Sequence, residues 1–368
     1  MTTSRASLTL AALCAAGAIL CAAPASAESR TYVRSWFSHA MASDDSDCAG
    51  GVNPPWAEQR LHNLADLGYS PQQIETMLAA ELSGKDRGAI NQIIRMRGRK
   101  DGQPVNPYSY PETVKDPKLR ASIGRYAYGF NLDGKGAASP DSFEDPETHE
   151  HGVNHALARA LGCMREFRGT LTTYPLYWDW VWGQLKGTDP AWLITISGGD
   201  LTRDGTVTVT IERALEHVRA NTDGSARRDA TYRIDPDPRS RNVYEGVLKN
   251  GVITAEGSAI RMIQDPLVAM EFRMSKVRLR LKTAADGTLD MMVGGYQPWS
   301  DIYYSFAAGA SGNESCSTGD MPGIYYLFKK FADAEPDPTG QNAAISATYY
   351  MQGLPAFSVA PARAGSAR

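Results

Sequence analysis

The spacing of apolar residues changes once along this 368-residue chain, near residue 188, and that change limits the folds open to it. Upstream, apolar residues recur at helical spacing, as in 57–67 and 71–82. Downstream, Val207, Val209 and Ile211 alternate with threonines, which is the period-2 pattern of a half-buried strand. The sequence therefore predicts an α+β protein, with a helical N-terminal region followed by a β-rich region.

Turn signals in the β-rich region indicate antiparallel pairing. Asn250-Gly251 separates two strand-like runs and suits a type I′ hairpin turn. Residues 276–282 alternate again, with apolar side chains on one face and Lys or Arg on the other. Antiparallel strands with one wet face are typical of a β-sandwich or a related jelly roll. Because helices are expected at 301–308 and 322–332, we predict a sandwich-like region with two inserted helices.

The first 27 residues have the pattern of a cleaved export signal. Arg5 supplies the positive charge, 8–23 an apolar stretch, and Ala25-Ser26-Ala27 a small-residue cleavage site. We therefore expect a periplasmic or secreted protein. No later apolar run reaches the roughly 18 to 20 residues that span a bilayer, so no membrane span is expected. The expected parts are a signal peptide at 1–27, a mainly helical region with a candidate metal-binding loop at 28–187, a sandwich-like region at 188–359, and a disordered tail at 360–368.

The net charge limits the classes of partner that we expect, and the cysteine content indicates which disulfides can form. Loss of Arg5 with the signal would leave 37 of the 38 basic residues against 41 acidic ones, a near balance that argues against a nucleic-acid partner. Cys48, Cys163 and Cys316 would remain, in a compartment where disulfides form. Because Cys48 and Cys163 both lie in the helical region, we predict that they pair, and that Cys316 is free or pairs between chains. The chain has no CxxCH motif for covalent haem.

Three of the six histidines lie within seven residues and form a candidate metal site: His149, His151 and His155. Neutral imidazole is the commonest protein ligand for divalent transition metals. If a helix begins near His151, then His151 and His155 share one face, and His149 reaches in from the preceding turn. The zincin motif HExxH is not matched, because Val153 stands where it needs histidine. The alternative interpretation is a solvated helix entry whose histidines bind nothing.

Oxygen donors precede the histidines and form a candidate calcium site. They are Asn131, Asp133, Asp141, Glu144 and Asp145. Calcium takes six to eight oxygen ligands of this kind. The spacing differs from that of an EF-hand, because Lys135 and Ser142 occupy ligand positions of that loop. The alternative interpretation is an ordinary acidic surface loop.

Two further groups are candidate binding residues for a small molecule or a glycan. Trp178, Trp180 and Trp182 alternate, so in a strand they would form a stacking platform for a sugar, whereas in a helix they would spread around its surface. A buried seam is the alternative interpretation. Arg278 and Arg280 lie on the outward basic face of their expected strand, where they could bind an anionic ligand or block edge pairing.

No sequence motif fixes a reaction. The chain lacks GxSxG, a phosphate loop and GxGxxG, which removes the easily recognised hydrolase, nucleotide and dinucleotide classes, so no nucleotide cofactor is expected. Two hypotheses remain. The first is an exported soluble binding or structural protein, with or without a stabilising metal. The second is a metal-dependent enzyme, hydrolytic or redox, that uses the histidine cluster with Glu150 or Asp145 as a base beside a metal-bound water.

Overall fold

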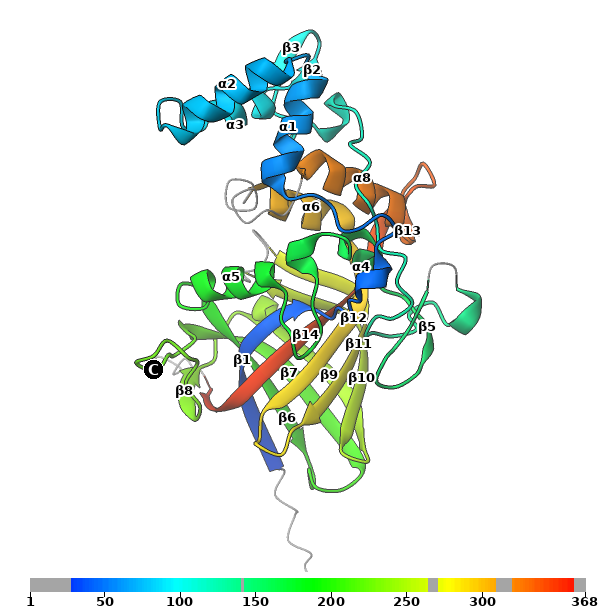
Figure 1. The fold of residues 1–368 in the computed structure, drawn as a ribbon. Helices are drawn as coiled ribbons and strands as arrows, with labels where there is room; N and C mark the ends of the chain where they lie inside the picture. The colour runs from blue at the N-terminus through cyan, green and yellow to red at the C-terminus, as the bar shows by residue number, and fades with distance from the viewer. Residues whose placement is uncertain (1–27, 140–141, 264–270, 309–319, 361–368) are drawn as a thin grey trace, which may run out of the picture.

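Eight antiparallel strands close into a β-barrel in the computed structural model, which describes residues 28–139, 142–263, 271–308 and 320–360 (Figure 1). In spatial order the barrel strands are β1 (Glu28–His39), β6 (Pro190–Gly198), β7 (Gly205–His217), β9 (Arg241–Lys249), β10 (Val252–Ile263), β11 (Glu271–Thr283), β12 (Leu289–Pro298) and β14 (Asn342–Val359). β14 then pairs with β1, from Thr31↔Ala356 to His39↔Tyr349, and this pairing closes the barrel.

The predicted fold class is wrong in two respects. The region expected to be helical begins with β1, a barrel strand that pairs on one side with β6 and on the other with β14. The remaining strands continue that single closed sheet and do not form the two packed sheets of a sandwich. The local pattern of β1 conceals it, because the register shifts between Arg34 and Trp36 and so breaks the alternation of inward and outward side chains.

Apolar side chains fill the interior of the barrel. Cross-strand pairing places Leu279, Val293 and Tyr349 on the inner face of three successive strands, and all three are buried. Phe37 from β1 stacks on Tyr349 with ring centroids 4.9 Å apart, and Phe272 from β11 packs edge-on against both rings. The inner face is therefore a packed core that the strands of both chain ends share.

Four short pairings lie outside the barrel path. β8 (Ala230–Arg233) runs parallel to the last residues of β14, and β13 (Ala334–Pro336) pairs with its first residues. Two small hairpins stand apart from the barrel, one formed by β2 (Gly98–Lys100) and β3 (Gln103–Val105), the other by β4 (Phe143–Glu144) and β5 (His151–Val153).

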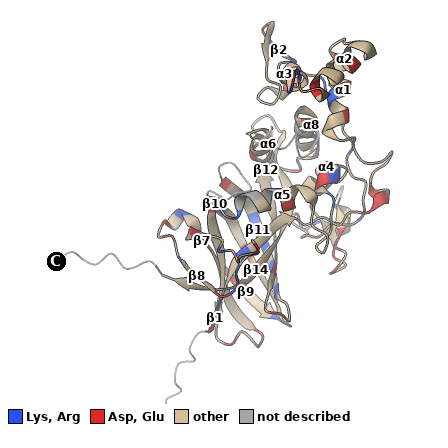
Figure 2. Ribbon diagram, turned by 60° about the vertical axis from the view of Figure 1, so that its left-hand side comes forward, with Lys and Arg blue, Asp and Glu red and all other residues tan. Residues whose placement is uncertain are grey.

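Helices gather at one end of the barrel in two layers, as Figures 1 and 2 show from two directions. The layer next to the barrel holds α4 (Ala156–Leu161), α5 (Leu176–Leu185), α6 (Trp299–Ala308) and α8 (Met321–Phe331). The outer layer holds α1 (Trp56–Asp66), α2 (Pro71–Leu82) and α3 (Ala89–Arg95). α6 and α8 correspond to the two helices expected within the β-rich region.

Local signals account for several of these elements. Ser70 caps α2 and forms a capping box with Gln73, and Pro71 occupies the first helical position. Asn250 and Gly251 both have positive φ, at 52° and 77°, as a type I′ turn requires between β9 and β10. At these sites the chemistry of neighbouring residues is sufficient to set the backbone.

One disulfide connects the segment after β1 to the residues just after α4. Cys48 and Cys163 are bonded, with their Cα atoms 5.6 Å apart, so the predicted pairing is confirmed. Three predictions fall on residues outside the described ranges: the state of Cys316, the signal peptide at 1–27 and most of the tail from 360. None of the helices in the described ranges has the length and apolar character needed to cross a lipid bilayer.

Candidate functional site

The three clustered histidines do not share a helical face, so the expected helix start near His151 is wrong. His149 has φ of 57°, His151 begins the short strand β5, and α4 starts only at Ala156. Gly152 has φ of 82°, and a Cβ there would meet the backbone of Gly136 at 2.3 Å. This left-handed, crowded position interrupts any helix and sends the histidines in different directions.

His149 and His151 are exposed and flank one carboxylate. Nδ1 of His149 lies 3.5 Å from Glu144, and Nδ1 of His151 lies 3.8 Å from it. In the ranges that the structure describes, no group of three or more His, Cys, Asp or Glu side chains is arranged to hold a metal ion. The transition metal therefore stays a prediction, and elemental analysis of protein purified without a histidine tag would test it.

The oxygen donors expected to bind calcium are engaged separately. Asp145 pairs with Arg280 at 2.8 Å, Glu144 pairs with Arg125 at 2.8 Å, and Asp133 accepts a hydrogen bond from Ser139 Oγ at 2.8 Å. The backbone carbonyl of Asn131 accepts from Arg278, and Asp141 lies outside the described residues. These partners hold the loop against the barrel, and calcium binding stays a prediction.

His155 lies apart from the other two histidines, at the position just before α4. The residue is 1% exposed, and within the described part of the chain neither ring nitrogen makes a well-aligned hydrogen bond, although the backbone of Tyr128 lies close enough to interact with the ring. Burial lowers the pKa of His155 to about 3, the backbone of Tyr128 opposes this shift, and the Arg159 guanidinium adds to it. His155 is therefore neutral near pH 7, and its ring has one nitrogen that donates and one that accepts.

His155 lines a polar pocket of about 290 Å³, here called the His155 pocket. Its walls come from the loop before β4, the start of α4, the end of α8 and the adjoining strands. The lining residues are Asp133, Lys135, Ser139, Asn154, His155, Ala156, Arg159, Tyr296, Lys330, Phe331, Ala332, Asp333 and Asn342.

Asp333 and Ser346 connect two walls of this pocket. The Asp333 carboxylate accepts hydrogen bonds from the backbone N–H of Ser346 at 2.7 Å and from its hydroxyl at 2.6 Å. The same hydroxyl accepts from the backbone N–H of Ala156 at 2.8 Å. Solvent reaches Asp333, while the surrounding protein raises the pKa of its carboxyl by desolvation. The start of α4 is thus fixed relative to the segment after α8.

A second network fixes the loop that forms the opposite wall. Asn154 Oδ1 accepts from the backbone N–H groups of Leu132 and Asp133, at 2.7 and 3.1 Å. Asn154 Nδ2 donates to Ser139 Oγ at 3.0 Å, and that hydroxyl donates to Asp133. Because these polar groups satisfy one another, the pocket has a defined shape, and the His155 ring is a part of its polar lining without a well-aligned hydrogen bond.

The tryptophan row does not form a strand. Trp178, Trp180 and Trp182 belong to the helix α5, which excludes the platform of three rings on one strand face. Trp182 is buried, and the Arg34 guanidinium lies 5.5 Å from its ring centroid. Trp182 therefore packs against the barrel.

Arg278 and Arg280 lie on the outer face of β11 and hold the loop before α4. Arg280 pairs with Asp145, and Arg278 pairs with Glu256 at 3.3 Å besides its bond to the Asn131 carbonyl.

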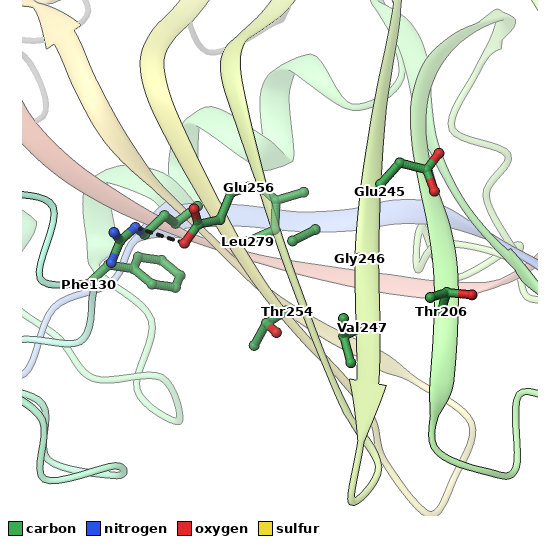
Figure 3. Close-up of a pocket in the computed structure, with 10 residues that line it drawn as sticks. Phe130, Thr206, Glu245, Gly246, Val247, Thr254, Glu256 and Leu279 are labelled. Carbon is green, nitrogen blue, oxygen red and sulfur yellow. Dashed lines mark ion pairs between the residues drawn. The ribbon is translucent and has the colours of Figure 1, made fainter.

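Arg278 also lines an open hollow of about 630 Å³, where Figure 3 shows Phe130 beside Glu256 at one end. Among the described residues that line this hollow, none is a buried polar group without a partner. We therefore consider the His155 pocket the stronger candidate site.

Comparisons of this chain with protein-family models, curated proteins and solved structures found no match. The candidate site is therefore defined by the geometry of the His155 pocket. Sequence reasoning missed Tyr296, Lys330 and Asp333, which approach His155 only through the fold and lie more than 140 residues away along the chain. The sequence signals were the histidine cluster, of which only His155 reaches the pocket, and the predicted calcium loop, of which Asp133 reaches it.

Proposed function

We propose that this is an exported binding protein whose ligand is a small polar molecule held in the His155 pocket. The observation that carries the proposal is the buried His155 ring, which lines a cavity and whose nitrogens the nearby Tyr128 backbone does not provide with a well-aligned hydrogen bond. An unsatisfied buried polar group costs roughly 1 to 3 kcal/mol. Ligand groups that complete its hydrogen bonds would remove that cost. The Cys48–Cys163 disulfide supports export, since disulfides persist in oxidising compartments.

The low pKa of His155 favours binding over acid–base catalysis. A general base works best when its pKa lies near the working pH. With a pKa of about 3, His155 is a weak base near neutrality but remains a good hydrogen-bond partner. Tyr296 is also uncharged there, because burial raises its pKa to about 12, with Asp333 and Asp133 acting in the same direction. Neutral, fixed hydrogen-bonding groups suit recognition.

The rim of the pocket indicates a ligand with a negative group. Lys330 is exposed beside the pocket and makes no ion pair within the described ranges, although its ammonium lies 5.0 Å from the Phe331 ring centroid. Lys135 at the other side is paired with Asp133 at 3.5 Å. Lys330 is thus a cation at the rim that a ligand can reach, and a compact hydroxy or amino acid would place its carboxylate there and a hydroxyl or amine on His155.

A stability measurement tests whether His155 is kept for a ligand. His155→Leu removes the unsatisfied polar ring and should raise the free energy of unfolding of the ligand-free protein by about 1 kcal/mol at pH 7. The matched control is His39→Leu. His39 is equally buried and lies near enough to His155 for the two rings to interact, but it packs against Tyr349 and Phe167 in the barrel, so its loss should destabilise. A fall of 2 kcal/mol or more in His155→Leu would show a structural role instead.

A ligand screen then tests binding directly. Amino acids, hydroxy acids and monosaccharides are added singly to wild-type protein, and the thermal midpoint is followed. A ligand of the His155 pocket should raise the midpoint of the wild type and leave that of His155→Leu unchanged. A compound that raises the midpoint of both proteins equally binds outside the His155 pocket. If every stabilising compound behaves in this way, the proposed site is wrong.

A further inference from the structure

A second, larger hollow lies on the outer face of the barrel, away from the His155 pocket. It has a volume of about 820 Å³, and its floor is formed by β11, β12 and β14. The loop around Thr148 forms one wall and the loop 171–174 forms the other. We call it the outer groove. A volume of this size is in the range that binding sites for small molecules and short polymers occupy.

Four side chains in the outer groove form a chain of hydrogen bonds in one direction. The hydroxyl of Tyr174 donates to Gln352 Oε1 at 2.6 Å, Gln352 Nε2 donates to the Tyr350 oxygen at 2.8 Å, and the Tyr350 hydroxyl donates to Asp290 at 2.5 Å. Burial raises the pKa of the Tyr350 hydroxyl, so it keeps its proton for this chain. Each group is therefore held in a fixed orientation.

This chain of hydrogen bonds leaves both donor and acceptor groups facing the outer groove. Gln352 Nε2 keeps a second hydrogen to donate, and the oxygens of Tyr174 and Asp290 keep lone pairs to accept. A hydroxyl group both donates and accepts hydrogen bonds, so a ligand with several neighbouring hydroxyls can pair with both the donors and the acceptors of the groove. A simple anion, which only accepts, cannot satisfy the acceptor groups.

An aromatic pair adds an apolar surface at the same place. The ring of Tyr174 stacks on Trp36 with centroids 4.1 Å apart and an interplanar angle of 27°. Trp36 is buried, whereas Tyr174 is 36% exposed, so Trp36 supports the ring from behind while part of it stays open to the groove. A rigidly supported aromatic ring beside fixed polar groups suits a ligand with one apolar face and a hydroxyl-rich edge.

Charge in the groove argues against an anionic ligand. Arg280 lies on the floor, but its guanidinium is paired with Asp145, whose side chain is fully buried. Asp290 and Glu147 bring negative charge to the lining, against Lys282 as the other cation. The lining of the outer groove therefore carries a net charge near zero.

From these observations we infer that the outer groove binds a neutral oligosaccharide, with a sugar ring against Tyr174 and hydroxyls on Gln352 and Asp290. This inference stands independently of the function proposed for the His155 pocket, because the two hollows share no lining residue.

The test is binding of the intact protein to an array of neutral oligosaccharides derived from starch, cellulose and chitin, followed by calorimetry with the best of them. Tyr174→Ala and Gln352→Ala should each weaken that affinity about tenfold, the loss expected for one hydrogen bond or stacking contact. The control is Tyr126→Ala, which removes another exposed tyrosine outside the groove and should leave affinity unchanged. Unaltered thermal midpoints of the variants confirm that they fold.

Two results would overturn the inference. One is an array on which no oligosaccharide is retained above an albumin control. The other is an oligosaccharide bound equally by the wild type, Tyr174→Ala and Gln352→Ala, which would place the binding elsewhere. Loss of binding in His155→Leu but not in the groove variants would assign the sugar to the His155 pocket, so the two proposals can fail separately.

Discussion

The carboxylate of Asp145 lies 2.8 Å from Nη2 of Arg280 and joins the loop before α4 to the outer face of β11. The Asp145 side chain is fully buried, and it also accepts hydrogen bonds from the backbone N–H groups of Gly129, Glu147 and Thr148. One carboxylate thus organises both ends of the loop that walls the His155 pocket.

Asp145→Asn should destabilise the protein by about 3 kcal/mol at pH 7, because breaking a buried pair leaves the Arg280 charge uncompensated. Burial alone would raise the pKa of Asp145, but Arg280 and the backbone donors outweigh it, and the pKa lies below 3.8. Stability from a lowered carboxyl pKa is complete above the unfolded value and is lost on acidification. Urea unfolding should therefore show the difference between wild type and variant shrinking as the pH falls below 3.8. Asp45→Asn, at an exposed ion pair with Arg168, is the control that should show little difference at any pH.

Acidification should also weaken the protein through His155. Its pKa of about 3 lies below the unfolded value of 6.5, so its contribution is complete above pH 6.5 and is lost as the pH falls toward 3. Relative to His155→Leu, the wild type should lose about 1.4 kcal/mol of unfolding free energy per pH unit in this window. His151→Gln, at an exposed position, should keep the wild-type slope. Parallel curves for wild type and His155→Leu would mean that His155 gains a proton in the folded protein.

Removal of the disulfide should be costly. Cys48 and Cys163 are 115 residues apart, and closing a loop of about that length contributes roughly 4 to 5 kcal/mol in the chain-entropy treatment. The double variant Cys48→Ala, Cys163→Ala should lose about that much by urea unfolding. Wild type treated with a reductant should approach the variant, and the variant itself should not respond. If complete reduction leaves the free energy of unfolding of the wild type unchanged, the disulfide does not make this contribution.

Asp320 should control the attachment of the outer helices. It accepts from Arg97 Nη2 at 2.6 Å and from Asn63 Nδ2 at 2.7 Å, and it caps α8 through the N–H of Gly323. Asp320→Ala leaves two buried donors without an acceptor, so hydrogen exchange in α1–α3 should accelerate more than exchange in the barrel strands. Asp320→Asn keeps the cap and removes the charge, and it should give an intermediate effect. Uniform acceleration across the whole chain would show that these helices do not unfold locally.

Local chemistry was sufficient to predict several features. Ser70 with Pro71 marks the start of α2, Asn250-Gly251 sets the β9–β10 turn, and alternation identifies β7 and β11. In each case the decisive contacts join residues only a few positions apart, so the physical cause is present in the sequence itself.

The tertiary structure decided the rest. Closure of the barrel depends on pairing Phe37 with Met351, more than 300 residues away, and no local pattern specifies that partner. In the same way His155 and Asp333 line one pocket only because β14 brings the segment following α8 beside α4, while left-handed Gly152 turns His151 away. The sequence by itself determined the strand-forming runs, the turns and the capped helices, because short-range hydrogen bonds and steric limits act along the chain. Barrel closure and the composition of both candidate sites were settled by long-range packing, in which each residue's surroundings come from distant strands.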